Sequence, residues 1–335
     1  MPDEFARCPK VELHLHLEGA IPLDTLWLLL TEHGGDPDVT DPGRLAQRMQ
    51  YTSFEHFLDI WWWMTGFVRR ETDFELAAAA VAADLASQNI VYAEASFSPT
   101  DFERHGLTPQ QIATAIRRGL DRVPDTQVVL NCDLVRNTGP ERAATTLQAV
   151  LEVAGEADIR GITIGGSERD YPPALFEGVY QTARECGMRL TAHAGEEAGP
   201  SSVRDAIELL GVERIGHGVR VVEDHALLDR VISEAIPLEV CPTSNLRTGV
   251  VGSWEEHPIG TLLERGAYVT VSSDDPTFFH TSVADELREL AHRYNADPAQ
   301  LTQRAIAASW MTEDEKIAKR DLVTQWWAGG HRRVG

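Results

Sequence analysis

The 335-residue sequence predicts an α/β protein built as a (β/α)8 TIM barrel with extra helices. Strand-like and helix-like segments alternate along the chain, which favours parallel strands joined by helices. The length suits a barrel of ~250 residues with insertions. Polar residues of the kinds that bind metals follow several strands, and barrels place their active sites at that end. We therefore expect a metal site at the C-terminal ends of the strands.

The first strand is predicted over 11–18, where four apolar residues alternate with Glu12, His14, His16 and Glu18. This period of two puts the four polar side chains on one face. Two imidazoles two positions apart on a strand can bind one metal ion. Because short His-x-His runs also arise by chance, further ligands downstream decide this interpretation.

Helices and strands are expected in alternation after the first strand. Pro22 suits a first helical turn, and Gly34-Gly35 ends that helix. Residues 36–52 are polar and contain prolines, which indicates a loop. Apolar spacing, strand-type residues and N-caps such as Thr108 predict the remaining elements. The expected helices cover residues 22–33, 74–88, 109–122, 140–155, 173–186, about 202–210, 224–235 and 259–265, with further helices after the last strand. The later strands cover residues 90–97, 127–133, 159–164, 188–193, 214–217, 236–240 and 268–273.

The segment 54–70 is unusually aromatic and contains Trp61, Trp62 and Trp63 in succession. Each helical step rotates the side chain by about 100°, so three consecutive residues cannot all face inward. Two interpretations remain open. The segment is either packed between layers of the protein or forms an apolar wall over a ligand site.

Composition bounds the domain count, partners and compartment. No linker, repeat or low-complexity block divides residues 1–335, so we expect one domain whose last ~8 residues form a loose tail. The chain has 30 Lys plus Arg against 52 Asp plus Glu, a net charge of −22, which excludes nucleic acid as a primary partner. Four scattered cysteines indicate free thiols. Without a signal peptide or a long apolar run, a cytoplasmic location away from membranes is expected, and the oligomeric state stays open.

Candidate chemical groups collect at strand ends: His14 and His16 after the first strand, His193 after the fifth, His217 after the sixth and Asp274 after the eighth. Three imidazoles and one carboxylate suit Zn²⁺, which lowers the pKa of a bound water, although Fe²⁺ or Mn²⁺ accepts the same set. A further histidine can take the water's proton and a carboxylic acid can protonate the electrophile. His217 and Glu196 are the remaining groups of these types.

Five motifs in order resemble the adenosine deaminase family of metal-dependent aminohydrolases over nearly the full length. They are His14-Leu15-His16-Leu17-Glu18-Gly19-Ala20, His193-Ala194-Gly195-Glu196, Arg214-Ile215-Gly216-His217-Gly218, Cys241-Pro242-Thr243-Ser244-Asn245 and Ser272-Ser273-Asp274-Asp275-Pro276.

The resemblance implies His14, His16, His193 and Asp274 as zinc ligands. It implies hydrolytic deamination of a 6-aminopurine to the 6-oxopurine and ammonia. By the same transfer, Glu196 protonates purine N1 and His217 orients or deprotonates the water. Asp275 contacts N7, and the backbone at Gly166 meets N3.

The substrate is less determined than the chemistry. Adenosine-specific members carry Asp at the position of Glu18, where it meets the ribose 5′-hydroxyl, and adenine-specific relatives tend to have Glu. The tryptophan segment suits an apolar 5′ extension, so aminodeoxyfutalosine of an alternative menaquinone pathway is the leading expectation. Arg69, Arg70 and Arg136 are three candidate partners for its carboxylate. Adenosine, through purine salvage, and adenine are the alternatives, and a non-catalytic zinc- or nucleoside-binding protein is the alternative of another class.

Overall fold

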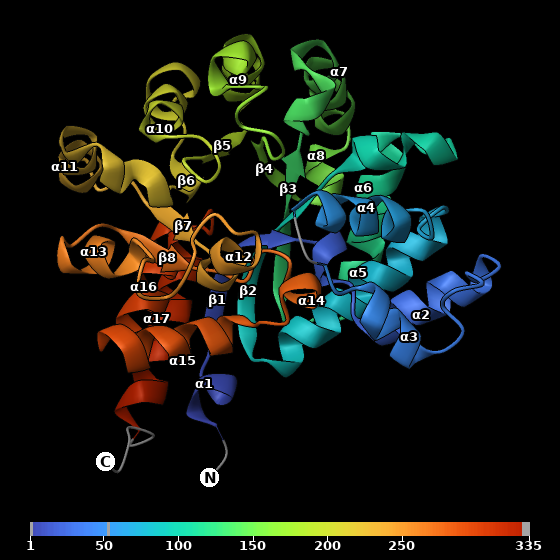
Figure 1. Ribbon diagram of the computed structural model, residues 1–335, viewed down its shortest axis with the longest axis horizontal. Helices are drawn as coiled ribbons and strands as arrows, with labels where there is room; N and C mark the ends of the chain where they lie inside the picture. Colours follow the sequence, from blue (N-terminus) through green and yellow to red (C-terminus); the bar gives the residue numbers. More distant parts are fainter. Residues whose placement is uncertain (1–2, 52–53, 330–335) are drawn as a thin grey trace.

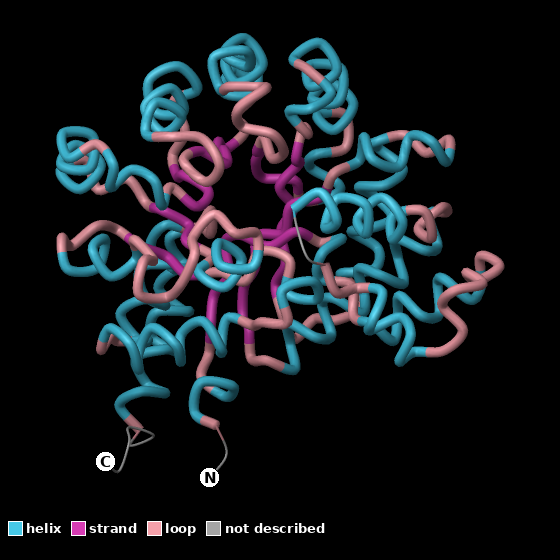
Figure 2. The backbone as a smooth tube through the Cα atoms, in the orientation of Figure 1, coloured by secondary structure: helices cyan, strands magenta, loops and turns pink. Residues whose placement is uncertain are grey.

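The computed structural model describes residues 3–51 and 54–329 and has eight parallel strands paired in chain order. The ring closes beyond the last strand, because the backbone of Asp274 donates to His14 O at 3.1 Å and accepts from His16 N at 2.9 Å. Figure 2 shows the strands at the centre and the helices outside them. The predicted barrel is confirmed. Its strands are β1 (Lys10–His16), β2 (Ile90–Phe97), β3 (Gln127–Asp133), β4 (Ile159–Thr163), β5 (Arg189–Ala194), β6 (Arg214–His217), β7 (Leu238–Val240) and β8 (Val269–Val271).

Helices surround this ring, and the blue helices of residues 23–48 extend outward on the right in Figure 1. The α-helices are α1 (Glu4–Arg7), α2 (Leu23–Glu32), α3 (Pro42–Arg48), α4 (Phe54–Thr65), α5 (Glu71–Ser87), α6 (Pro109–Leu120), α7 (Pro140–Leu151), α8 (Ala154–Ala157), α9 (Glu177–Glu185), α10 (Pro200–Asp205), α11 (His225–Ser233), α12 (Pro242–Arg247), α13 (Ile259–Glu264), α14 (Pro276–Phe279), α15 (Val283–Tyr294), α16 (Pro298–Ala308) and α17 (Glu313–Ala328). The 3₁₀ helices are η1 (Glu18–Ala20), η2 (Pro99–His105), η3 (Arg136–Thr138), η4 (Pro173–Phe176) and η6 (Val219–Glu223), and η5 (Ala206–Leu210) is a π-helix that continues from α10.

Several boundaries differ from the sequence prediction, and the following are examples. β1 ends at His16, because Leu17 adopts a right-handed helical conformation (φ −57°, ψ −42°), so Glu18 lies in the turn η1. The expected loop 36–52 contains α3, whose first turn Asp41 caps by accepting from Arg44 N. The expected helix 140–155 is two helices, α7 and α8, separated near Val153. Residues 330–335 of the expected tail lie outside the described residues.

The N-cap that the sequence predicts at Thr108 is present in the structure. Thr108 caps α6 by accepting from Gln111 N, and the Gln111 side chain accepts from Thr108 N in return. This reciprocal arrangement satisfies two amides of the first turn. α6 packs tightly on α5, where a Cβ on Gly119 would lie 2.4 Å from the carbonyl oxygen of Glu75. A glycine is therefore required at this crossing.

The barrel interior below the C-terminal ends holds a buried ion cluster rather than only apolar side chains. Arg214, 1% exposed, donates to Glu239 Oε1 at 2.5 Å and to Glu94 Oε2. Its guanidinium lies 4.0 Å from the ring centre of Trp310, and the backbone N–H of Trp310 donates to Glu94 at 2.7 Å. Every charge in this cluster thus has a partner, as burial requires.

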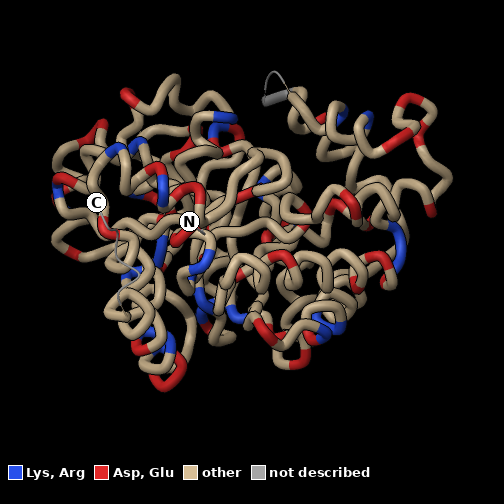
Figure 3. Tube along the Cα trace, turned by 90° about the horizontal axis from the view of Figure 1, so that it is seen from below, with Lys and Arg blue, Asp and Glu red and all other residues tan. Residues whose placement is uncertain are grey.

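Figure 3 shows acidic and basic residues interspersed along the chain trace. Among the described residues, no helix has the length and apolar character needed to cross a membrane.

Candidate active site

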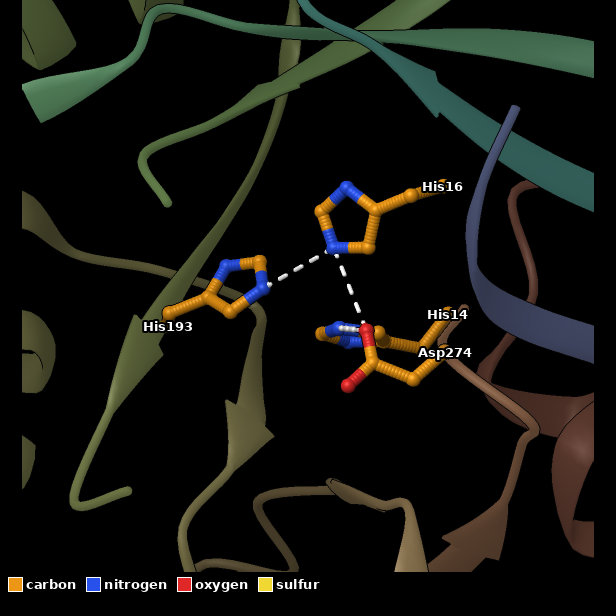
Figure 4. A group of neighbouring side chains, drawn as sticks. All are labelled: His14, His16, His193 and Asp274. Atoms are coloured by element: carbon orange, nitrogen blue, oxygen red, sulfur yellow. Dashed lines mark hydrogen bonds and ion pairs between the residues drawn. The ribbon is translucent and has the colours of Figure 1, made fainter. Parts of the chain in front are cut away.

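Four predicted side chains from three parts of the chain meet at the C-terminal end of the barrel. His14 and His16 come from β1, His193 comes from β5, and Asp274 follows β8 (Figure 4). Their ligand-type atoms all lie within 4.8 Å of one another, and all four residues are buried. His16 Nε2 is 3.3 Å from both His193 Nε2 and Asp274 Oδ1. The strand period and the barrel closure together place these groups at one point.

Two of the four side chains, His14 and Asp274, are oriented by a neighbour that leaves one atom turned toward this point. His14 Nδ1 lies 3.0 Å from Glu239 Oε2, while its buried Nε2 has no hydrogen-bond partner. Ser244 donates to Asp274 Oδ2 at 2.6 Å, which leaves Oδ1 toward the histidines. Such outer partners fix ring orientation in metal sites. The orphaned nitrogen and the His₃Asp donor set fit a divalent metal ion.

The electrostatics of the cluster favour positive charge. Burial lowers the pKa of His14, but Asp274 and Glu239 outweigh it and raise that pKa to about 10. The pKa of His16 is also raised, to about 9, because Asp275 and Asp274 outweigh burial. Carboxylates that hold protons on these rings also attract a cation that replaces the protons.

Backbone strain accompanies the site. Asp274 has φ +66° and His217 has φ +60°, both in the left-handed region that residues other than glycine rarely adopt. Strain of this kind persists only where surrounding structure enforces it and concentrates at functional sites. At Asp274 the two backbone hydrogen bonds to β1 supply that constraint.

Glu196 and His217 face each other beside the cluster, with Glu196 Oε2 3.4 Å from His217 Nε2. Burial, together with the charges of Asp274 and Glu168, raises the pKa of Glu196 to about 8. Burial lowers the pKa of His217 to about 3. At neutral pH the pair therefore consists of a carboxylic acid and an uncharged imidazole, the states needed for a proton donor and a proton acceptor.

The predicted substrate contacts border the same region. Asp275 is buried and its Oδ1 has no hydrogen-bond partner. Gly19 lies directly behind it, since a Cβ there would be 1.8 Å from Asp275 Oδ1. Glu18 Oε1 accepts from Ser98 N at 2.9 Å, and its buried Oε2 has no partner. Gly166 lines a cavity of about 530 Å³ together with Glu196.

The three arginines proposed for a distal carboxylate are engaged elsewhere. Arg136 donates to the carbonyl oxygens of Tyr171, Ile164 and His193 and is fully buried. Arg70 pairs with Glu32 and Asp73 on the surface, and Arg69 donates to Gly66 O. The guanidinium groups thus have local backbone and acidic partners, and a contact of any of them with a substrate carboxylate stays a prediction.

The tryptophans have three different environments. The Trp61 ring packs on Phe278, with ring centres 5.9 Å apart, and its Nε1 donates to Asp101 at 3.0 Å. Trp62 is 49% exposed, and Trp63 donates to Asp36 at 2.8 Å. The prediction that the three cannot all face inward is confirmed. Trp61, through Phe278, contacts the α14 segment that follows Asp275.

Sequence reasoning assigned no role to several residues that hold the site together. Glu239 orients His14, Ser244 orients Asp274, and Asn245 Nδ2 lies 3.2 Å from His217 Nδ1. Ser244 and Asn245 fall in a motif already noted, which was the available signal. Glu239, within the buried strand β7, was identifiable only as a charge among apolar neighbours.

A (β/α)8 barrel with a buried His₃Asp cluster at its strand ends, and an acid and an imidazole beside it, defines a metal-dependent hydrolase. The Adenosine deaminase family model matches residues 9–326. An adenine deaminase of Vibrio parahaemolyticus is 34% identical over 325 residues, covering 95% of this chain and 96% of that protein. An adenine deaminase of Bordetella parapertussis is 36% identical over 322 residues, covering 95% and 99%.

Solved structures of two similar proteins have the same fold. An adenine deaminase from Arthrobacter aurescens superposes with a TM-score of 0.88 at 30% identity, covering 96% of this chain and 99% of that one. A Burkholderia ambifaria amidohydrolase with bound Zn superposes with a TM-score of 0.88 at 26% identity, covering 97% and 92%. The chain belongs to the adenosine deaminase family and is a metal-dependent deaminase that acts on an aminopurine.

Proposed function

We propose that this protein is a zinc-dependent deaminase of adenine, releasing ammonia and leaving the 6-oxopurine. The observation that carries the chemistry is the buried His₃Asp cluster with the Glu196–His217 pair beside it. Relatives named adenine deaminase, with 32–36% identity, support the substrate. Glu18 supports it too, because it is one methylene longer than the aspartate of adenosine-specific members and fills more of the sugar side.

In this proposal His14, His16, His193 and Asp274 hold the metal. Zn²⁺ in such a site supplies a water of lowered pKa and charge stabilisation. Iron or manganese would suit the same donors, and elemental analysis of purified protein distinguishes the three. Less than one tightly bound metal per chain with activity intact would contradict the assignment.

The chain's own residues then move two protons. Glu196, protonated at neutral pH, donates to purine N1 and makes C6 more electrophilic. His217 accepts the water's proton at Nε2. We assign Asn245 the amide orientation that puts its otherwise unpartnered oxygen on His217 Nδ1–H, because this leaves Nε2 as the acceptor.

The purine is oriented by groups on either side of this pair. Burial and the charge of Asp274 raise the pKa of Asp275 to about 8, so its carboxyl group can donate to N7. The backbone N–H of Gly166 donates to N3. A Cβ at residue 166 would lie 2.1 Å from Asn137 Oδ1, and φ is +104°, so this position requires glycine.

A second candidate is a nucleoside extended at the 5′ carbon, such as aminodeoxyfutalosine in menaquinone synthesis. The cavity of about 530 Å³ that begins at Gly166 and Glu196 favours it, since this space exceeds what a free base fills. Adenosine is intermediate in size between the free base and the 5′-extended nucleoside. A non-catalytic nucleoside-binding protein would need neither Glu196 nor His217.

The test compares kcat/KM for adenine, adenosine and aminodeoxyfutalosine with zinc-loaded enzyme, following loss of the 6-amino chromophore. A preference of ~100-fold for adenine, about 2.7 kcal/mol in the transition state, is the expected result. An equal preference for aminodeoxyfutalosine or adenosine would replace adenine by that substrate. Glu196→Gln should keep the metal and lose most turnover, and full turnover in that variant would remove Glu196 from the mechanism.

A further inference from the structure

The loop that carries Glu196 donates its backbone N–H groups to one buried carboxylate from a neighbouring loop, and Arg220 donates to two of the loop's carbonyl oxygens, Gly195 O at 2.9 Å and Glu197 O at 2.7 Å. Glu168, 2% exposed, accepts four consecutive backbone N–H groups, those of residues 195–198. Gly195 N donates to Oε1 at 2.6 Å, and the other three donate to Oε2 at 3.0, 2.7 and 2.9 Å. Ser202 Oγ donates to Oε1 at 2.5 Å. Five donors exceed the roughly four lone-pair sites of a carboxylate, so the three N–H groups on Oε2 share its lone pairs.

The loop conformation is built for this contact. Gly195 has φ +73°, and a Cβ there would lie 2.4 Å from Val203 Cγ2. The positive φ turns successive N–H groups toward one point, the arrangement that forms an anion-binding concavity. In this chain the anion is an internal side chain.

Glu196 itself has few other restraints. The one side-chain interaction found for it among the described residues is the 3.4 Å approach of Oε2 to His217 Nε2. Its side chain is 21% exposed and lines the cavity that also contains Gly166. The direction of the Glu196 carboxyl group therefore depends on its backbone, and Glu168 holds that backbone.

Glu168 also connects the two loops that border the proposed purine site. It lies two residues after Gly166, and its side chain binds the backbone of the loop that carries Glu196. Asp133 Oδ1 accepts from Gly165 N at 2.8 Å, and Asn137 Oδ1 accepts from Ser167 N at 2.8 Å. The segment 165–168 is thus fixed at both ends of its turn. A shift of Glu168 would move Glu196 relative to Gly166.

We propose that Glu168 is a positioning residue that sets the direction of Glu196 for proton transfer, acting through the backbone of residues 195–198. This inference rests on the proposed role of Glu196. Positioning is worth large factors in rate, since a misplacement of about 1 Å can cost ~100-fold. The effect belongs in kcat, because substrate contacts at Asp275 and Gly166 and the metal ligands are not touched by the substitution.

The experiment is a double-mutant cycle on metal-loaded enzyme with Glu168→Gln, Glu196→Gln and the double variant. In Glu168→Gln an amide NH₂ replaces one oxygen and faces N–H donors, so the loop shifts. We expect kcat to fall by ~10- to 100-fold with KM within about 3-fold. In the Glu196→Gln background the same substitution should cost less than about 3-fold, because the residue it positions is already gone.

Asp73→Asn is the matched control. Asp73 is 1% exposed and its Oδ2 accepts from Arg69 N and Arg70 N, both at 2.9 Å, far along the chain from the site. It should lower the melting temperature and leave kcat per bound metal within about 2-fold. Ser202→Ala, which removes one of five donors, should lower kcat less than Glu168→Gln does.

Equal losses from Glu168→Gln in both backgrounds would overturn the inference and make Glu168 purely structural. An unchanged kcat in Glu168→Gln would overturn it as well. If Glu196→Gln itself keeps full turnover, the proposed role of Glu196 fails instead, so the two failures are distinguishable. Metal content is measured for every variant, so that a lower rate caused by unfolded or metal-free protein is recognised.

Discussion

His14 and Glu239 form a pair in which the carboxylate holds one imidazole nitrogen and frees the other, with Nδ1 3.0 Å from Oε2. The remaining oxygen of Glu239 accepts from Arg214, whose guanidinium also reaches Glu94. The orientation of a predicted metal ligand is therefore fixed by an ion cluster that extends through the barrel interior to Trp310.

Substituting Glu239 should lower the affinity for the metal ion more than it changes the rate of the metal-loaded enzyme. Glu239→Gln leaves the ligand set intact but loses the charge that makes His14 a better donor, and such outer partners are worth ~10- to 100-fold in metal affinity. Metal-buffered titration of the apoprotein measures this change. Asp73→Asn serves as the control and should not change affinity. An unchanged dissociation constant in Glu239→Gln would show that the pair is only packing.

The clustering of the four proposed metal ligands was predictable from sequence, and the residues that support them were not. Period-two alternation places His14 and His16 on one face, and strand ends of a barrel converge, so the four ligands could be predicted together. Glu239 and Glu168 act through contacts between residues far apart in the chain. Glu168 follows no strand directly, and its partners are backbone N–H groups that leave no trace in the side-chain sequence.

Activity should fall as the pH rises through the pKa of Glu196. That pKa is raised to about 8, first by burial and then by the charges of Asp274 and Glu168. The acid form that donates the proton is therefore present below about pH 8 and lost above it. A bound cation offsets part of the charge of Asp274 and moves the decline toward lower pH.

A profile of kcat/KM between pH 5 and 10 measures this loss of activity at high pH. The residual turnover of Glu196→Gln should not show it, since the amide does not titrate. A rate in the unsubstituted enzyme that stays constant up to pH 10 would contradict Glu196 as the proton donor.

Gly19 should tolerate no side chain, because a Cβ would lie 1.8 Å from Asp275 Oδ1. In Gly19→Ala the Asp275 carboxyl group has to move away from its unpartnered position. We expect kcat/KM to fall by at least ~100-fold, in line with the effect of a displaced substrate contact. Steady-state kinetics measure it.

Gly178→Ala is the control for that substitution. Gly178 lies in α9, and a Cβ there meets no atom within 4 Å. Alanine within a helix is favoured over glycine by about 0.5–1 kcal/mol, so this variant should be fully active and slightly more stable. If Gly19→Ala were equally active, Asp275 would not contact the substrate.

The aromatic segment shows a limit of sequence-based prediction. Helical rotation correctly indicated that the tryptophans diverge, but it could not say which one points where. That depended on distant partners, Asp101 for Trp61 and Asp36 for Trp63. The same limit explains the arginines, because Arg136 satisfies carbonyl groups that only the folded loops bring together.

The two neighbouring tryptophans should differ in what they contribute to stability. Trp61 packs on Phe57 and Phe278 and donates to Asp101, so Trp61→Ala should lower the free energy of unfolding by about 2–3 kcal/mol, less than a fully buried ring. Trp62 is 49% exposed and lies under Arg104, so Trp62→Ala should cost less than about 1 kcal/mol. Urea denaturation of metal-loaded protein compares the free energies of unfolding of the two variants.

Kinetics of the same variants then decide between packing and a substrate wall. If Trp61→Ala lowers kcat/KM for aminodeoxyfutalosine but not for adenine, Trp61 contacts the 5′ extension. Equal values for both substrates would leave the ring as packing alone.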